Sequence, residues 1–557
     1  MKKLLVWLCF MFLLVPQALA IEKIGVNNKF GMHLAVASDE DLKAVAKLVN
    51  SNGGQYGYVT LVIPDNDLNV HKWQAVFDQI RKLQLIPIVR LATHGQDDSW
   101  VRPKKEDAKK WLRFLNSLNW VTKNRYVILF NEPNHATEWG GRVDSADYAE
   151  VALSFAKILK ENNNDYFVML AGLDQAAPQQ LSRYASAEIF LTAVIKQIGI
   201  ENFKTYIDGL SSHSYPNPGF VGLPYQRGWG TVAGYEAELA LLQSLGVSKE
   251  LPVFITETGW QRGVLDEQTV ADYFVTVFNN LWLPDTRVVA VTPFILNYQS
   301  DPFLGFSWQK KGNSDFYLQY QAVEELTKIK GRPVIEENIS FLNRLPEKLV
   351  EDSSFLINLT ISNLGQGYWD SDYGYELRLI SKDNYYYRFS RLSDLVPGTN
   401  KQVTFEFHTP KKKGQTSIKI GLFHDDKKQA ESAWWQIKIM PLQKLKLSYR
   451  LLNFNNNGHD FKILLYDNNE HLVYETGLVN GHKGQIQIEG IRNVALGEKY
   501  RVVLLKPGYL PRQTFVVFKE QNNQAKLKLM WPLDWNQDGQ WSLLDFKALF
   551  VSEIAPD

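Results

Sequence analysis

Eight short apolar runs, separated by longer stretches with helical spacing of apolar residues, constrain how the first part of this chain can fold. The runs cover residues 30–34, 56–63, 85–91, 126–130, 166–170, 207–212, 252–256 and 288–296. A continuous apolar run of this length is typical of a strand buried on both faces, as in a parallel sheet covered by helices. Eight such βα units predict one (β/α)8 TIM barrel of about 300 residues. The alternative, a doubly wound open sheet, normally carries a glycine-rich phosphate turn after its first strand, and none is present here.

The sequence pattern changes after residue 335, where short alternating strand-like runs replace the βα units. Residues 336–440 and 441–530 each contain several such runs, separated by turn-forming clusters. Short strands at this spacing indicate antiparallel sandwiches. We therefore predict a barrel over residues 21–335, an immunoglobulin-like sandwich over 336–440, a second β-rich module over 441–530 and a short separate terminus over 531–557.

The first 20 residues have the pattern of a secretory signal. Lys2 and Lys3 precede an apolar stretch over residues 4–15, and small residues up to Ala20 resemble a cleavage site. An uncleaved membrane anchor is the alternative, but the stretch is shorter than the roughly 20 residues that a span needs. We expect a secreted or cell-surface protein that keeps no membrane span after cleavage. Its only cysteine, Cys9, lies in the signal, so disulfides and thiolate chemistry are excluded from the mature chain.

Composition argues against nucleic acid and suits a sugar ligand. Without Lys2 and Lys3, 59 of the 61 basic residues remain against 60 acidic ones. A nearly neutral chain lacks the basic surface that binds nucleic acid. Aromatic residues make up 13% of the chain, and aromatic rings can stack on the flat apolar faces of sugars. We expect a polysaccharide or oligosaccharide partner.

Two of the apolar runs end in a glutamate. Glu132 follows the fourth run and Glu257 follows the seventh. A barrel keeps its chemistry at the carboxyl ends of its strands, and the tips of strands four and seven face one another across the mouth. Hydrolysis of a glycosidic bond requires two carboxyl groups placed in this way, and a separation of roughly 5 Å would suit double displacement. Capping of the following helices is the structural alternative for both.

Other polar residues follow neighbouring strands. Arg90 lies at the tip of the third strand, Asn131 precedes Glu132, and His213 and Tyr215 follow the sixth strand. Each has a structural alternative, since Arg90 could form an ion pair and His213 and Tyr215 could be buried in the rim. Four more residues lie in loops at the same rim: His135, Glu138, Trp139 and Trp260. They could contact sugar, or they could close the top of the barrel core.

The set Asn131-Glu132-Pro133, His213-x-Tyr215 and Glu257-Thr-Gly-Trp260 resembles the clan of retaining (β/α)8 glycoside hydrolases, over roughly residues 25–330. The resemblance implies that Glu132 is the general acid and then base, and that Glu257 is the nucleophile. Asn131 would bond the sugar 2-hydroxyl, Tyr215 would bond Glu257, and His213 would line the subsite beside the cleaved bond. No cofactor is implied for catalysis. The clan usually has an arginine at the tip of strand two, whereas Arg90 lies at the tip of strand three. Trp308 is the candidate for the clan's stacking tryptophan of strand eight.

A second motif lies near the carboxyl terminus. Oxygen-bearing side chains occupy loop positions one, three, five, nine and twelve, and these are Asp534, Asn536, Asp538, Ser542 and Asp545. Gly539 stands at position six, and Gln540 at position seven offers its backbone carbonyl. Such spacing is typical of calcium binding, and residues 546–550 suit the start of a helix. The loop resembles one half of a dockerin. A calcium-stapled terminus, a half-module for a cohesin-like or cell-surface partner, and a chance acidic turn are the three interpretations.

The sequence therefore favours a secreted glycoside hydrolase that cleaves a β-linked glycan with retention. A non-catalytic carbohydrate-binding surface protein on the same barrel is the first alternative. A transglycosylase is the second, because it shares the first chemical step and uses a sugar in place of water as acceptor. The pattern names neither the glycan nor endo or exo action.

Overall fold

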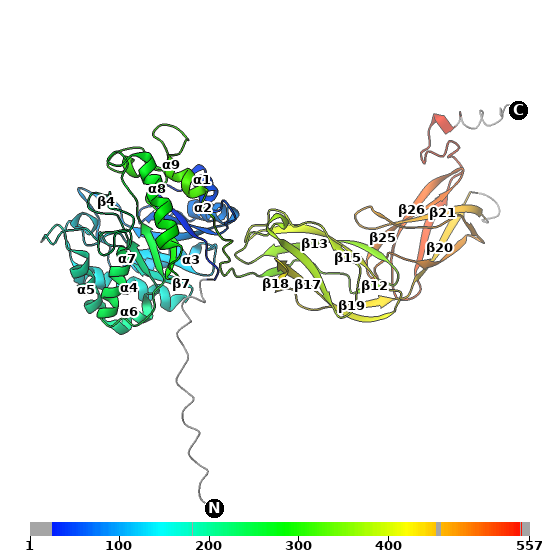
Figure 1. The fold of residues 1–557 in the computed structure, drawn as a ribbon. Helices are drawn as coiled ribbons and strands as arrows, with labels where there is room; N and C mark the ends of the chain where they lie inside the picture. Colours follow the sequence, from blue (N-terminus) through cyan, green and yellow to red (C-terminus); the bar gives the residue numbers. More distant parts are fainter. Residues whose placement is uncertain (1–24, 181, 453–457, 546, 548–557) are drawn as a thin grey trace, which may run out of the picture. The chain divides into compact units, whose positions relative to one another are not determined.

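The computed structural model describes residues 25–180, 182–452, 458–545 and 547. The chain divides into two compact units, one reaching residue 336 with residues 366–368 added, and the other formed by residues 337–365 and those from 369 onward (Figure 1). The predicted signal over residues 1–20 lies outside the described residues. Across the described ranges, no helix is both long and apolar enough to cross a membrane.

The first unit is an eight-stranded parallel barrel, which confirms the predicted fold. Its strands, in chain order, are β1 (Lys29–Leu34), β2 (Gly57–Pro64), β3 (Leu85–Ala92), β6 (Arg125–Leu129), β7 (Tyr166–Leu170), β8 (Leu210–His213), β9 (Val253–Glu257) and β10 (Val288–Val291). They pair in the order β7, β6, β3, β2, β1, β10, β9, β8. A parallel bridge between Met169 and Gly209 brings the two outer strands together and closes the barrel.

Helices follow most of the strands and cover the outside of the barrel (Figure 1). They are α1 (Asp39–Val49), α2 (Val70–Lys82), α3 (Asp107–Ser117), α4 (Ser145–Asn162), α5 (Ala187–Ile198), α6 (Ile200–Tyr206), α7 (Gly234–Ser244), α8 (Glu267–Val277) and α9 (Leu318–Glu324). Polar side chains start several of them. At α1, the Asp41 amide donates to Ser38 Oγ at 3.1 Å, which satisfies a backbone donor that the helix itself leaves free. A small hairpin, β4 (Gly95–Gln96) and β5 (Ser99–Trp100), follows β3.

Aromatic side chains fill the interior at the amino-terminal ends of the strands. The ring of Phe254 lies 5.1 Å from that of Tyr126, 5.4 Å from that of Phe167 and 6.3 Å from that of Tyr58. All four side chains are buried. The barrel is therefore packed at this end, as is usual for the fold, and only the carboxyl-terminal end is left for a site.

The eighth strand is shorter than predicted. The apolar run suggested a strand over residues 288–296, but β10 ends at Val291. Pro293 follows, and because proline has no N–H it cannot continue the ladder. The chain leaves the sheet at this point, and Phe294 enters the mouth of the barrel.

The second unit consists of β-sheets, as predicted for the region after residue 335. Its first part pairs β11 (Ile339–Phe341), β13 (Ser354–Asn363), β16 (Asn400–His408) and β15 (Tyr387–Phe389) in one sheet. A second sheet pairs β12 (Lys348–Val350), β19 (Trp435–Met440), β17 (Gly414–His424) and β14 (Tyr375–Ser381), with β18 (Lys427–Glu431) on β17. Alternating burial along β19 and β17 gives one apolar face to the core between the sheets.

Its later part has two further sheets. One contains β24 (Gln485–Ile491), β20 (Gln443–Leu451) and β27 (Gln524–Met530); the other contains β22 (Leu472–Glu475), β21 (Gly458–Tyr466), β25 (Lys499–Lys506) and β26 (Tyr509–Val517), with β23 (Val479–Gly481) on β21. Most pairs are antiparallel, but β12 with β19 and β20 with β27 are parallel. Each core includes a side chain from the other part of this unit. Ala495, from the later part, packs in the first core, and Val350, from the first part, packs in the second core.

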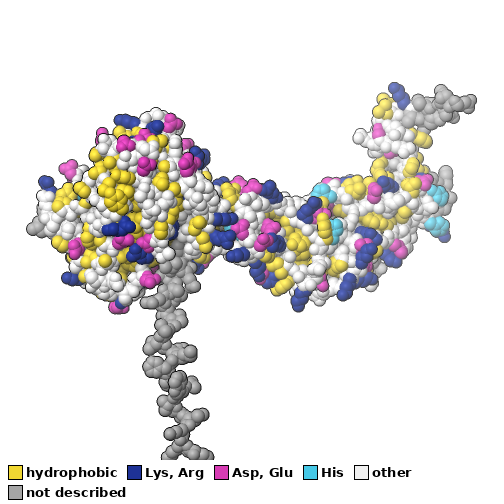
Figure 2. All heavy atoms as spheres, viewed as in Figure 1, with side chains coloured by type: hydrophobic (Ala, Val, Ile, Leu, Met, Phe, Trp, Pro, Cys, Tyr) yellow, Lys and Arg dark blue, Asp and Glu magenta, His cyan; other side chains and the backbone are white. Residues whose placement is uncertain are grey.

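Charged side chains of both signs are interspersed over the face drawn in Figure 2. Both units carry acidic and basic groups there, and neither presents a broad surface of one sign. This distribution agrees with the formal net charge of +1 for the whole chain.

We expect Phe254→Ala to destabilise the barrel by about 3–5 kcal/mol, because the substitution removes a fully buried ring from the aromatic cluster and leaves a cavity. Calorimetric unfolding of the full chain measures this as a lower temperature for the barrel transition. Tyr225→Ala is the matched control, since Tyr225 is 69% exposed. Equal shifts for the two variants would contradict the description of this core.

Candidate active site

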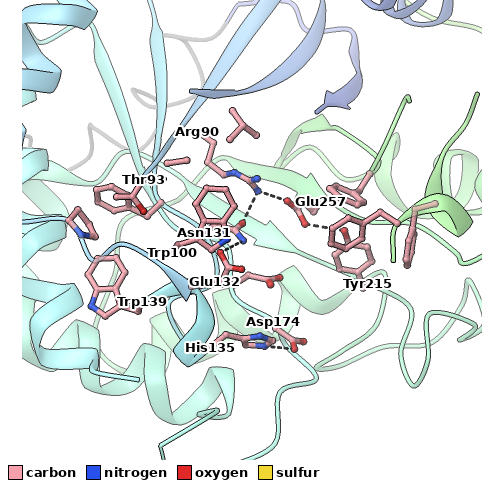
Figure 3. Close-up of a pocket in the computed structure, with 18 of the residues that line it drawn as sticks. Arg90, Thr93, Trp100, Asn131, Glu132, His135, Trp139, Asp174, Tyr215 and Glu257 are labelled. Atoms are coloured by element: carbon pink, nitrogen blue, oxygen red, sulfur yellow. Dashed lines mark hydrogen bonds and ion pairs between the residues drawn. The ribbon is translucent and has the colours of Figure 1, made fainter. Parts of the chain in front are cut away.

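Side chains from four strand tips converge at the carboxyl-terminal mouth of the barrel. Arg90 comes from β3, Glu132 follows β6, His213 ends β8 and Glu257 ends β9. Figure 3 shows Arg90 between Asn131 and Glu257, with Tyr215 on the other side of Glu257. The predicted strand-tip residues are therefore brought together by the fold.

A sharp turn after β6 presents Glu132. Phe130 has a φ of 75° and Glu132 a φ of 31°, in the left-handed region that residues with a side chain rarely adopt. The Glu132 amide donates to Gly172 O at 3.1 Å, and the His135 amide donates to Glu132 O at 2.9 Å. These backbone bonds hold the strained turn, a kind of strain that often marks a functional site.

Glu257 is almost completely buried and is surrounded by donors. Arg90 Nη1 donates to Glu257 Oε1, and the Tyr215 hydroxyl donates to Oε2 at 3.0 Å. His33 Nε2 lies 3.5 Å from Oε1, and His213 Nδ1 lies 3.7 Å from Oε2. Glu257 itself is 7% exposed.

These neighbours hold Glu257 in its charged form. Burial alone would raise the pKa of the carboxyl, but the charges of His213 and Arg90 outweigh it and lower the pKa of Glu257 to about 2. His33 adds no charge near neutrality, because burial and Arg90 lower its pKa to about 3. Arg90 and His213 therefore supply the positive charge.

His213 lies beneath the mouth and contacts both glutamates. Its Nδ1 is 2.7 Å from Glu132 Oε1, and its side chain is 1% exposed. Burial opposes the charged imidazole, yet Glu257 and Glu132 together raise the pKa of His213. The ring packs directly on the backbone of Gly172, where an added Cβ would lie 2.2 Å from His213 Cδ2. Glycine at this position is thus required for the ring to reach Glu132.

The two glutamates approach closely. One carboxylate oxygen of Glu132 and one of Glu257 lie within 4.8 Å of each other, with a His213 nitrogen within the same distance of both. Such atoms could also hold a metal ion. Here, however, both oxygens of Glu257 already accept bonds from Arg90 and Tyr215, so this set is better explained by pairing within the protein.

The amide of Asn131 is fixed at both ends. Its Oδ1 accepts from Arg90 Nη1 at 2.7 Å, and its Nδ2 donates to Glu138 Oε2 at 3.1 Å. A hydrogen-bonded chain thus runs from Glu257 through Arg90 and Asn131 to Glu138. One N–H of the Asn131 amide group is left for a ligand.

A cavity of about 320 Å³ lies over this chain of groups. Its lining includes the predicted Arg90, Asn131, Glu132, Tyr215 and Glu257, together with the rim residues His135, Glu138 and Trp139. Aromatic side chains form much of the remaining wall, and these are Trp100, Phe130, Phe220, Phe294, Phe303 and Phe306. A concave, largely apolar pocket with a few convergent polar groups is the usual form of a small-molecule site.

Trp260 and Trp308 do not line this cavity, which corrects the prediction that they contact the ligand. Trp260 is 2% exposed and donates its Nε1 to Gly222 O at 2.7 Å. Trp308 is 1% exposed, and its ring lies 4.9 Å from that of Phe274. Both pack against helix α8, so their role is in the core. His213 is also buried, and it contacts Glu132 from the barrel interior and does not line the cavity.

Several residues of the site were missed by the sequence analysis. His33 ends up beside Glu257, although it lies inside the first apolar run, where a polar residue in a buried strand is the available signal. Asp174 follows the fifth strand and lies 2.7 Å from His135 Nε2. Phe294 lies beyond the true end of β10. No sequence spacing linked these residues to the two glutamates.

Three carboxylates also converge in the predicted C-terminal loop. Asp534, Asp538 and Asp545 each place an oxygen within 4.8 Å of the others, and Asp534 and Asp545 are buried. The Gly539 amide, at a φ of 82°, donates to Asp534 at 3.2 Å, and the Ser542 amide donates to Asp545 Oδ2 at 2.7 Å.

The remaining predicted ligands of this loop are partly used within it. Asn536 Nδ2 donates to Asp538 Oδ2 at 2.7 Å, and Asn536 Oδ1 accepts from the Asp538 amide at 3.1 Å. Ser542 Oγ accepts from the Leu544 amide at 3.1 Å. The side chain of Gln540 is exposed. Of the helix suggested for residues 546–550, all but Lys547 lie outside the described residues.

No protein-family model matches this chain, and no curated protein matches it. Among solved structures, it is similar to an endo-beta-1,4-glucanase with a triple mutation from Xanthomonas axonopodis pv. citri (TM-score 0.38, 11% identity, covering 54% of this chain and 98% of the other). It is also similar to a family 51 alpha-L-arabinofuranosidase from Bifidobacterium longum (TM-score 0.36, 10% identity, 69% and 97%). A third is a family 44 xyloglucanase from Paenibacillus polymyxa (TM-score 0.33, 12% identity, 84% and 95%). At these scores the likeness carries no argument about function.

We expect Glu257→Gln to reduce the loss of barrel stability in acid. Folding lowers the pKa of Glu257 from 4.5 to about 2, so the stability contributed by its charge is present above pH 4.5 and lost as the pH falls toward 2. The full shift corresponds to at most about 3 kcal/mol, and glutamine does not titrate. The measurement is the free energy of unfolding of the barrel in urea, determined at a series of pH values from 7 down to below 4.5.

The quantity compared is the change of the unfolding free energy with pH. The absolute stability is not compared, because the variant also removes the ion-pair partner of Arg90. Glu188→Gln is the control, since Glu188 is exposed on helix α5, and it should keep the wild-type slope. A Glu257→Gln slope equal to that of wild type would contradict the charge state assigned to Glu257.

Proposed function

We propose that the barrel is a glycoside hydrolase that cleaves a β-linked glycan by double displacement with retention. The observation that carries the proposal is the approach of the Glu132 and Glu257 oxygens to within 4.8 Å. In retaining enzymes the two carboxyl groups lie roughly 5 Å apart, whereas inverting enzymes need a wider gap for water. The cavity above both carboxyls and its aromatic walls support a sugar as the ligand.

The different surroundings of the two glutamates support different roles. Glu257 has Arg90 and Tyr215 as donors and stays ionised, as a nucleophile requires. Glu132 is only half-buried at the edge of the cavity, and its Oε1 faces His213. We assign Glu132 as the acid and base.

In the first step, a Glu257 oxygen attacks the anomeric carbon while the bond to the leaving oxygen breaks. Glu132 gives its proton to that oxygen, and a glycosyl ester forms on Glu257. In the second step, Glu132 takes a proton from water, which attacks the same carbon and releases Glu257 as a carboxylate.

Asn131 would meet the sugar through its remaining N–H. Arg90 and Glu138 fix the amide plane before substrate arrives. A donor held in this way costs little reorganisation when charge develops on the sugar ring, so its bond strengthens in the transition state.

We further propose that this chemistry takes place outside the cytoplasm and that the C-terminal loop binds Ca²⁺. The pattern of residues 1–20 supports secretion. For the loop, the buried carboxylates of Asp534 and Asp545 lie close together, and like charges so placed need a counter-ion. Oxygen ligands at EF-hand spacing suit calcium.

We expect Glu257→Gln to lose turnover of 4-nitrophenyl β-glycosides by at least about a thousandfold while it still binds oligosaccharide, because the nucleophile is gone and the pocket is kept. Glu132→Gln should lose most activity on substrates with poor leaving groups and much less on those with good ones. Initial rates on a matched substrate panel measure both effects.

The stereochemistry of the product completes this test. Proton NMR of the first product formed should show the β-anomer, and an inverted product would remove the nucleophile role of Glu257. A wild-type protein that binds oligosaccharide but cleaves none of a broad panel would favour the carbohydrate-binding alternative. Transfer to an added sugar acceptor in preference to water would favour the transglycosylase.

We expect Asp534→Ala to reduce calcium affinity at least about tenfold, since it removes a buried carboxylate from position one of the loop. Calorimetric titration of the full chain with CaCl₂ measures the change. Asp98→Ala is the control, because Asp98 is exposed on the barrel. Calcium binding that is the same in both variants would refute the loop assignment.

A further inference from the structure

Four carboxyl groups line the cavity, and three of them face a cationic partner. Glu257 pairs with Arg90, Asp174 with His135, and Glu132 with His213. The fourth is Glu138, whose hydrogen-bond partner is the amide of Asn131. Within the described residues, no Lys, Arg or His nitrogen forms an ion pair with Glu138.

The partners of the other three carboxyls are groups whose charged forms are favoured by those carboxyls. Arg90 is always protonated. Burial disfavours a charge on His135, but its bond to Asp174 and the nearby Glu132 raise its pKa. The pKa of His213 is raised as well. His33, the other imidazole beside Glu257, stays neutral. One guanidinium and two imidazoles therefore face the other three carboxyl groups.

Among the described residues that line the cavity, Glu138 is thus the carboxyl whose bond goes to an amide and not to a cationic side chain. The proposed function, on which this inference rests, places a sugar in this cavity. A neutral sugar adds no charge beside Glu138, whereas a ligand with its own carboxylate adds an uncompensated charge to a poorly solvated site.

We propose that Glu138 is a specificity-determining residue that restricts the site to neutral glycans and excludes uronic acid residues. Its Oε2 accepts the Asn131 bond, which leaves Oε1 to accept a hydroxyl of the bound sugar. Glu138 lies in the cavity wall beside Trp139, with Asn131 between it and Arg90. Its position is thus within the proposed sugar site.

The surroundings of Glu138 make it sensitive to a further negative charge. Burial raises its pKa, and the carboxyls of Glu132 and Glu257 raise it further, while Asn131 and Arg90 act in the opposite direction. A uronic acid carboxylate nearby would either repel the ionised Glu138 or force it to take up a proton. Both outcomes cost binding energy, and an unmatched like charge at an interface is typically strongly unfavourable.

The experiment measures ligand binding rather than turnover. Thio-linked β-oligosaccharides, in which sulfur replaces the cleaved oxygen, are titrated calorimetrically into the full-length protein near pH 7. Each neutral oligosaccharide is compared with its counterpart oxidised to the uronic acid at C6, and with a glucosamine-containing member that is cationic. The proteins are wild type, Glu138→Gln and the control Glu188→Gln.

We expect wild type to bind the best neutral member at least about tenfold more tightly than its uronic acid counterpart, which is 1.4 kcal/mol. In Glu138→Gln this ratio should fall at least about tenfold, mainly through improved uronic acid binding, because glutamine removes the charge and keeps an acceptor for Asn131. The Glu188→Gln ratio should equal that of wild type.

Three results would overturn the inference. The first is a neutral-to-uronic ratio that Glu138→Gln leaves unchanged. The second is tighter wild-type binding of the uronic or the cationic member. The third is binding of none of the oligosaccharides. A protein that shows the expected ratios yet never cleaves an O-linked substrate would contradict the proposed hydrolase and leave the role of Glu138 intact, so the two failures can be told apart.

Discussion

The ion pair between Arg90 and Glu257 is the interaction on which the rest of the site depends. It joins β3 to β9 across the barrel mouth, although 167 residues separate the two side chains in sequence. Burying two charges is expensive, and an isolated buried pair often fails to repay the cost of desolvation. This pair is retained with further support, because Tyr215 donates to the second oxygen of Glu257 and Asn131 accepts from Arg90.

From this pair the remaining groups follow in order. Arg90 orients Asn131, and the orientation of Asn131 fixes which end of its amide meets Glu138. On the other side, the charge of Glu257 raises the pKa of His213, which bonds Glu132. The two carboxyls proposed for chemistry are therefore coupled through one imidazole. That coupling depends on Gly172, because any side chain there would displace the ring.

Much of the barrel follows from local sequence, whereas its packing does not. Apolar runs predicted all eight strands and placed Glu132, Glu257 and Arg90 at the same rim, since parallel strands bring their carboxyl ends together. The prediction for β10 was too long because Pro293 interrupts an otherwise apolar run. Trp308 was assigned to the ligand because it follows that strand, but its packing with Phe274 is set by helix α8, which no local pattern reports. Glu138 was predicted only as a rim residue, because its bond to Asn131 is formed by the fold and leaves no mark in the sequence.

Buried carboxylates are stabilised in two ways in this chain, by cationic side chains in the barrel and by backbone amides in the C-terminal loop. In the barrel, three of the four carboxyls that line the cavity pair with Arg90, His135 and His213, and the fourth, Glu138, bonds the amide of Asn131. In the C-terminal loop, Asp534 and Asp545 are buried near Asp538, and their bonds within the loop come from backbone amides such as those of Gly539 and Ser542. Amides stabilise a carboxylate but do not neutralise it. The paired carboxyls of the barrel thus have cationic partners within the fold, whereas the loop carboxylates are held by amide donors, and Ca²⁺ is the counter-ion that we propose for them.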